Sequence, residues 1–146
     1  MSNDRPTPNT RADYRHFLPI QTRWMDNDQY GHINNVTYYS YFDTVVNDYL
    51  IAKGLLDPAT SPQIGLVVHT QCHYFASAGF PESLEAGLAV KKLGNSSVVY
   101  AIGLFKKDGN TCIAQGEFTH VYVDRTSNKP TPLPDDMRAT LESLLA

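Results

Sequence analysis

The sequence has little of what several large protein classes require. Only two cysteines, Cys72 and Cys112, occur in 146 residues. Both fall in strand-like runs, so we expect reduced core thiols and no disulfide. No apolar run approaches the length of a membrane span, and the residues before Phe17 lack the apolar segment of a secretory signal. These absences favour a cytoplasmic protein that does not bind a membrane.

Charge and motif spacing exclude further classes. A formal net charge of -3 argues against binding nucleic acid through bulk electrostatics. The histidines lack zinc spacing, and neither a GxSxG elbow nor a phosphate loop is present. Asp26 and Asp28 imitate the start of a calcium loop, but Thr37 stands where the bidentate glutamate is required. We therefore expect no metal and no bound cofactor.

The chain is long enough for one domain with a real core, and 42% of its residues are hydrophobic. Residues 1–13 are polar and predict a mobile leader, which leaves a single domain over residues 14–146. A first strand is expected over residues 17–24, at a sheet edge because Pro19 cannot donate to a ladder. Apolar residues at helical spacing predict a long helix over residues 36–53, closed by Gly54.

From Ile64 onward the apolar period changes to two. Strands are expected over residues 64–74, 84–90, 98–104 and 111–123, with Leu66, Val68, Thr70, Cys72 and Tyr74 on one face of the first of these. Gly116 is expected to mark a bulge. A short helix with Asp135 and Asp136 in its first turn follows a proline-rich stretch. This order predicts an α+β fold, an antiparallel sheet around one long buried helix.

The stretch from Asp26 to Asn35 lies between the first strand and the long helix. It contains two carboxylates, a Gly-His pair, and two asparagines where the helix should begin, and asparagine is a good N-cap. The first turn of a helix offers free N–H groups and a partial positive charge. An acid beside such a turn is suited to act on a carbonyl whose oxygen the amides hold.

The pattern Asp-x-Asp-x-x-Gly-His-Ile-Asn-Asn, followed by Tyr38 and Tyr41-Phe42-Asp43, resembles the acyl-CoA thioesterases of the 4-hydroxybenzoyl-CoA thioesterase type. The resemblance runs over about residues 17–123 and includes Tyr74 and the turn at 94–97. It implies the hotdog fold and hydrolysis of an acyl-CoA to a carboxylic acid and free CoA. It also implies a homodimer or homotetramer with active sites at the subunit interface.

The resemblance assigns the chemistry to three residues. Asp28 matches the family's nucleophile or general base, and Asn35 matches the position whose backbone N–H polarises the thioester carbonyl. His32 either bonds the substrate or positions Asp28, or is a structural histidine. The alternative for Asp28 is a turn residue that accepts backbone amides. Asp26 is interpreted as structural, either in an Asx turn or as a partner for Arg23.

Further positions are assigned to substrate binding. Gly31 allows close approach of the substrate, although a turn glycine with positive φ is equally compatible. The remaining substrate-binding positions are Asn34, Tyr38, Val68, His69, Asn95, Ser96 and Ser97. Simpler interpretations stand beside these: core packing for Tyr38, a half-buried strand histidine for His69, and an ordinary hairpin turn for residues 95–97.

Two other functions stay open. One is a protein that binds an acyl thioester without turnover, in which Asp28 is structural. The other is a hotdog dehydratase or hydratase, which uses a histidine with a second acid in a different arrangement. The preferred acyl group, and CoA as against acyl-carrier protein, are left open.

Overall fold

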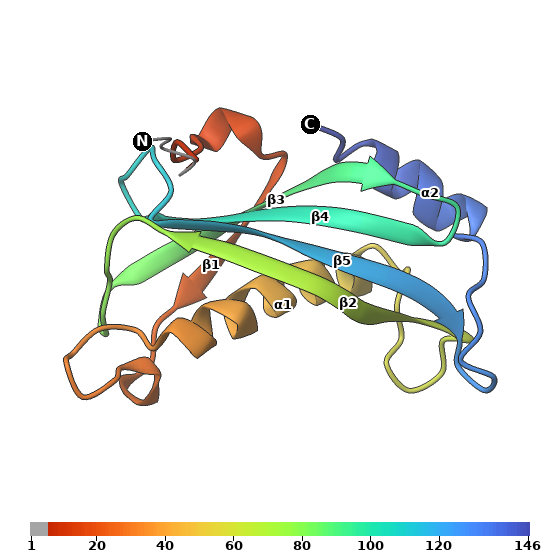
Figure 1. Ribbon diagram of the computed structural model, residues 1–146, viewed down its shortest axis with the longest axis horizontal. Coiled ribbons are helices and arrows are strands. Elements are labelled where there is room, and N and C mark those ends of the chain that lie inside the picture. Colours follow the sequence, from red (N-terminus) through yellow and green to blue (C-terminus); the bar gives the residue numbers. More distant parts are fainter. Residues whose placement is uncertain (1–5) are drawn as a thin grey trace, which may run out of the picture.

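The computed structural model describes residues 6–146 and consists of one five-stranded antiparallel sheet and two α-helices (Figure 1). The elements are β1 (His16–Gln21), α1 (Asn35–Ala52), β2 (Gln63–Tyr74), β3 (Ser83–Leu93), β4 (Ser97–Lys106), β5 (Ala114–Asp124) and α2 (Asp135–Glu142), with short 3₁₀ turns at Arg11–Asp13 and Trp24–Asp26. The strand order is β1-β3-β4-β5-β2. This is the predicted fold class.

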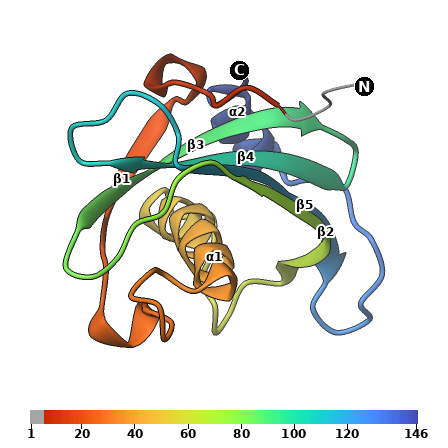
Figure 2. The ribbon, with the colours of Figure 1, turned by 60° about the vertical axis from the view of Figure 1, so that its left-hand side comes forward.

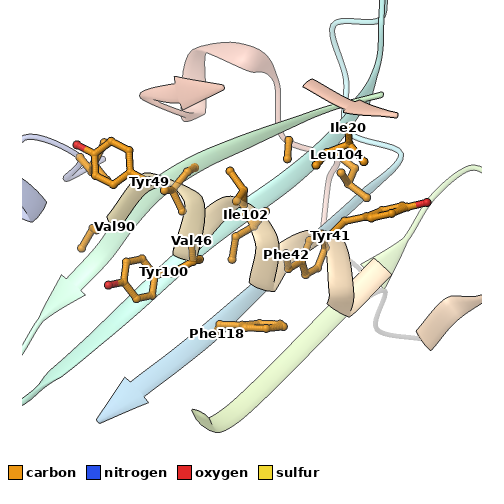
Figure 3. Packing of buried hydrophobic residues seen from close by; sticks show 14 of the residues in the cluster. Ile20, Tyr41, Phe42, Val46, Tyr49, Val90, Tyr100, Ile102, Leu104 and Phe118 are labelled. Atoms are coloured by element: carbon orange, nitrogen blue, oxygen red, sulfur yellow. The ribbon is translucent and has the colours of Figure 1, made fainter. Parts of the chain in front are cut away.

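The sheet curves around α1, which Figure 2 shows nearly end-on beneath it. Phe42, Val45 and Val46 of α1 are completely buried. They pack against strand residues such as Tyr100, Ile102 and Phe118, as Figure 3 shows for several of them. A helix with apolar side chains on most of its faces needs such a wrapped sheet to bury it.

The ends of α1 follow the local sequence. Asn34 is the N-cap, and its side chain accepts from the Val36 N–H at 3.0 Å. Helical residues therefore begin at Asn35, one position before the predicted start. Gly54 has φ of 72°, the left-handed conformation expected of a glycine just past a helix end.

Two predictions for the strands are wrong. The register of β2 against β5 shifts between Val67 and His69. Leu66 and Thr70 are four positions apart, an even spacing that predicts one face, but the shift puts them on opposite faces. Gly116 keeps regular pairing with Ile102. Its missing side chain instead admits the ring of Phe42, whose Cε2 would lie 2.8 Å from a Cβ at this position.

The face of the sheet away from α1 is partly covered by the N-terminal segment. Tyr14 packs with Ala89, Phe105 and Cys112. The Asn9 N–H donates to Gln115 at 2.6 Å, so this part of the predicted leader contacts β5. Residues 1–5 of that leader lie outside the described residues. Cys72 and Cys112 are both free thiols, as predicted.

Candidate active site

Asp26 anchors the loop that precedes α1. Its side chain is 1% exposed, and its carboxylate accepts from the Tyr41 hydroxyl at 2.6 Å and from the Arg23 guanidinium at 3.0 Å. Burial raises the pKa of Asp26, but the hydrogen bonds from Tyr41 and Arg23 outweigh it, so the pKa falls below its usual value. The Asp26 carbonyl also accepts from the Asn34 N–H at 2.9 Å. The predicted pairing of Asp26 with Arg23 is thus confirmed. Asp26 also ties the loop to Tyr41 of α1 and to the N-cap residue Asn34.

Asp28 lies in a tight turn that its own side chain stabilises. Its Oδ1 accepts from the backbone N–H groups of Tyr30 and His32 at 2.8 and 3.2 Å. Its N–H donates to the His32 carbonyl at 2.7 Å. Gly31, with φ of 78°, takes the left-handed conformation that this turn requires. The second carboxylate oxygen, Oδ2, makes no hydrogen bond within residues 6–146.

The first turn of α1 leaves one backbone amide uncommitted. The Val36 N–H donates to the Asn34 side chain and the Thr37 N–H to the Asn34 carbonyl. The Asn35 N–H has no acceptor within the described chain. Because the helix dipole adds partial positive charge here, this amide is suited to hold a carbonyl oxygen.

Asp28 and Asn35 line one cavity of about 410 Å³. The other lining residues are His32, Ile33, Tyr38, Tyr74, Phe75, Ala76 and Ser77. The Tyr74 hydroxyl donates to the Asn35 carbonyl at 3.1 Å, and the Tyr38 and Tyr74 rings meet edge to face. The end of β2 and the start of α1 therefore contact each other and line the same site.

Other candidate nucleophiles near this cavity are protonated at neutral pH. Burial raises the pKa values of Tyr38 and Tyr74 above the usual range. Burial also raises the pKa of the Cys72 thiol to about 11. A thiol must be ionised to act as a nucleophile, so Asp28 is the group best placed for chemistry among these side chains.

The structure brings together only some of the predicted site residues. Asp28, His32, Asn35 and Tyr38 line the cavity, while the Asn34 side chain caps α1. The hydrogen bonds between His32 and Asp28 involve the His32 backbone N–H and carbonyl.

The other predicted substrate-binding residues do not line this cavity. His69 pairs with Thr119 and shares a face with His73, the face away from Phe118 and α1. Val68 is exposed at the bulge of the edge strand. Asn95 and Ser96 lie in the β3–β4 turn and Ser97 begins β4. This turn lies beside α2, at the opposite end of the sheet from the start of α1 (Figure 1).

Sequence reasoning missed two parts of this site. The bond from Tyr41 to Asp26 joins residues 15 positions apart, and no local pattern indicates it. Residues 75–77 line the cavity because they follow directly after Tyr74 at the end of β2. The sequence could have indicated these residues, because they lie between the predicted strand that ends at Tyr74 and the pair Phe80-Pro81. Within residues 6–146 no cluster of three or more His, Cys, Asp or Glu side chains is arranged to hold a metal ion.

An antiparallel sheet wrapped around one long helix is the architecture of the hotdog fold. Residues 22–141 match the family model of the thioesterase-like superfamily, and the chain belongs to this family. None of the described helices is long and apolar enough to cross a membrane.

Several known proteins are similar to this chain in sequence or in fold. The crystal structure of the PA5185 protein from Pseudomonas aeruginosa strain PAO1 is similar, with 49% identity, a TM-score of 0.94, and coverage of 96% of this chain and 98% of that chain. YsmA of Bacillus subtilis (strain 168) is 25% identical over 94% of this chain and 92% of its own length. Slr0204 from Synechocystis, a 1,4-dihydroxy-2-naphthoyl-CoA thioesterase, shares the fold, with 16% identity, a TM-score of 0.79, and coverage of 88% of this chain and 96% of that chain.

Proposed function

We propose that this protein is an acyl-CoA thioesterase that hydrolyses its substrate to a carboxylic acid and free CoA. The observation that carries the proposal is the placement of a half-buried carboxylate, Asp28, and an uncommitted helix amide, Asn35 N–H, on one cavity. The family and a structural neighbour named as a CoA thioesterase support it.

The two groups suit the two demands of thioester hydrolysis. The Asn35 N–H donates to the thioester oxygen and stabilises the negative charge that develops there. Asp28 acts in one of two ways. It attacks the carbonyl carbon, expels the CoA thiolate and forms a mixed anhydride that water hydrolyses, or it takes a proton from an attacking water. Either route yields the acid and the free thiol.

The first test compares the wild type with Asp28→Asn. The amide oxygen of asparagine can still accept from the Tyr30 and His32 N–H groups, so the turn is retained while the charge is lost. We expect thiol release from a panel of acyl-CoAs to fall by about 10²–10⁴-fold. Asp108→Asn, an exposed turn carboxylate, is the control and should keep wild-type rates. Thiol release that survives in Asp28→Asn would reject the assigned residue.

A second candidate is a protein that binds an acyl thioester without turnover. Asp28 Oδ1 accepts hydrogen bonds from two backbone N–H groups, which favours this candidate. A carboxylate oxygen that is already hydrogen-bonded within a turn is less available to attack a substrate. No thiol release from any ester, together with measurable binding of acyl-CoA by calorimetry, would replace the enzyme proposal with this one.

We further propose that the protein is a homodimer joined through the edges of β2, or a homotetramer made of two such dimers. This strand is 12 residues long, and among the strands of residues 6–146 it pairs with β5 alone. Its exposed side chains include Leu66, Val67 and Val68. A long apolar edge strand with free backbone groups is a template for pairing with another chain. Two copies of the chain can pair their β2 strands antiparallel about a two-fold axis, so that the backbone groups of each edge form hydrogen bonds with the other.

A further inference from the structure

The first turn of α1 contains two consecutive peptide units whose polar groups are hydrogen-bonded in a fixed pattern. In the unit that joins Asn34 to Asn35, the carbonyl accepts from the Thr37 N–H at 2.9 Å. In the unit that joins Asn35 to Val36, the N–H donates to the capping side chain of Asn34 at 3.0 Å. The carbonyl of this second unit accepts from the Tyr74 hydroxyl at 3.1 Å. The fourth polar group is the Asn35 N–H, the amide that the proposed reaction uses.

The hydrogen bond from Tyr74 reaches this turn from a different element. Asn34 directly precedes α1 and Thr37 lies within it, whereas Tyr74 is the last residue of β2 and is 39 positions from Asn35. A helix end that is bonded through its own cap can still shift as a unit. The bond from β2 therefore restrains the Asn35 peptide relative to the sheet and to the cavity wall.

The ring and the hydroxyl of Tyr74 make separate contacts. The ring meets the Tyr38 ring edge to face, with 5.1 Å between the centroids, while the hydroxyl donates to Asn35. Burial raises the pKa of Tyr74 above its usual value, so the hydroxyl keeps its proton at neutral pH and can donate. Replacement of Tyr74 by phenylalanine thus removes the hydrogen bond and retains the ring.

We propose that Tyr74 is a positioning residue, which holds the Asn35 N–H in the direction that it needs to stabilise the oxygen of the thioester in the transition state. The inference rests on the proposed thioesterase activity. Donors to a developing oxyanion are most effective when they are aimed before the reaction begins, and a small misplacement of a reacting group lowers the rate strongly. In this proposal Tyr74 acts through the backbone of Asn35 and does not touch the substrate.

The first experiment measures kcat and KM of Tyr74→Phe with the acyl-CoA that the wild type hydrolyses fastest. We expect kcat and kcat/KM to fall together by about tenfold with KM unchanged, because the lost interaction matters only in the transition state. The control is Tyr49→Phe, a buried tyrosine in the C-terminal half of α1 whose ring packs against His16. It should keep the wild-type values. A wild-type kcat in Tyr74→Phe, or a raised KM without a change in kcat, overturns the inference.

The second experiment removes the Asn35 N–H itself. Asn35 is the first residue of α1, a position that proline favours because its missing N–H is not needed there by the helix. Asn34 has ψ of 136°, within the range that a residue before proline prefers. The reference is Asn35→Ala, which loses the same side chain and keeps the N–H. We expect thiol release by Asn35→Pro to be about 10²–10³-fold below that of Asn35→Ala.

The two experiments are then combined, with Tyr74→Phe introduced into each Asn35 variant. If Tyr74 acts through the Asn35 N–H, its replacement should lower kcat by about tenfold beside Asn35→Ala and leave kcat nearly unchanged beside Asn35→Pro, because the amide that it positions is already absent. An equal loss beside both variants overturns the inference, since the hydroxyl would then act on the substrate independently of the amide.

The outcomes separate this inference from the proposed function. Absence of thiol release by the wild type from every ester overturns the thioesterase itself. Equal thiol release by Asn35→Pro and Asn35→Ala overturns the role of the amide, and the inference with it, while hydrolysis remains. Thiol release that depends on the Asn35 N–H and not on the Tyr74 hydroxyl overturns the inference alone.

Discussion

At the scale of single residues, a buried charge determines how the candidate site is built. Asp26 carries the hydrogen bonds that join Arg23, Tyr41 and the loop, while Asp28, two residues later, faces the cavity. Two carboxylates close in sequence thus have different surroundings, one fully bonded and buried, the other half-buried at the cavity wall. We infer that the first holds the loop in place and the second performs the chemistry.

Replacement of Asp26 by asparagine should lower the stability of the fold by about 3 kcal/mol at neutral pH, because Arg23 and Tyr41 lose a charged partner. The pKa of Asp26 is depressed in the folded state. Its contribution is therefore fully present above the unfolded pKa and is lost as pH falls through the folded value. Denaturant unfolding at pH 7 and at pH 3 measures this. The stability gap between wild type and Asp26→Asn should narrow at the lower pH, and an equal gap at both would contradict the assignment.

At the scale of elements, the contact between α1 and β5 depends on one residue without a side chain. Gly116 pairs with Ile102 and Cys72 in the middle of the sheet. The space above its Cα is filled by the Phe42 ring, which also packs edge to face on Phe118. The glycine thus sets how closely α1 approaches the sheet.

Gly116→Ala should destabilise the fold by about 1–3 kcal/mol, because the added methyl overlaps the Phe42 ring and the backbone of β2. The control is Gly109→Ala in the β4–β5 connection, where the nearest atom to a new Cβ is 3.5 Å away. That variant should unfold within about 0.5 kcal/mol of wild type. Thermal and denaturant unfolding compare the two, and equal stability of both variants would reject the packing argument.

At the scale of the whole molecule, the sheet has two edges of different character. The β1 edge is a six-residue strand with Pro19 in it, a feature that discourages further pairing. The β2 edge is twice as long and carries exposed apolar side chains. We therefore expect the sheet to continue into a second subunit through the edge of β2.

Val68→Lys should convert the proposed dimer to a monomer, because a lysine at the centre of this edge places like charges opposite each other about the two-fold axis. Sedimentation analysis measures the mass and thiol release measures the activity. Leu145→Lys, an exposed apolar position after α2, is the control and should leave the mass unchanged. A Val68→Lys protein that keeps the wild-type mass would show that the subunits associate elsewhere.

The sequence by itself determined the long helix with its glycine end, the edge position of β1 and the α+β order of the elements. These follow from apolar period and turn residues, which act over a few neighbours. It also placed Asp28 and Asn35 on either side of one turn, so their common cavity could be predicted.

Only the tertiary structure decided the rest. Three features depend on contacts between different elements. They are the register shift of β2 against β5 at Val67, the Phe42 ring above Gly116, and the hydrogen bond from Tyr41 to Asp26. The distance of the 95–97 turn from the start of α1, and the side of the sheet on which His69 lies, likewise depend on the sheet as a whole. Such contacts are set by packing and strand register, and a one-residue shift in register reverses every face that an alternating sequence predicts.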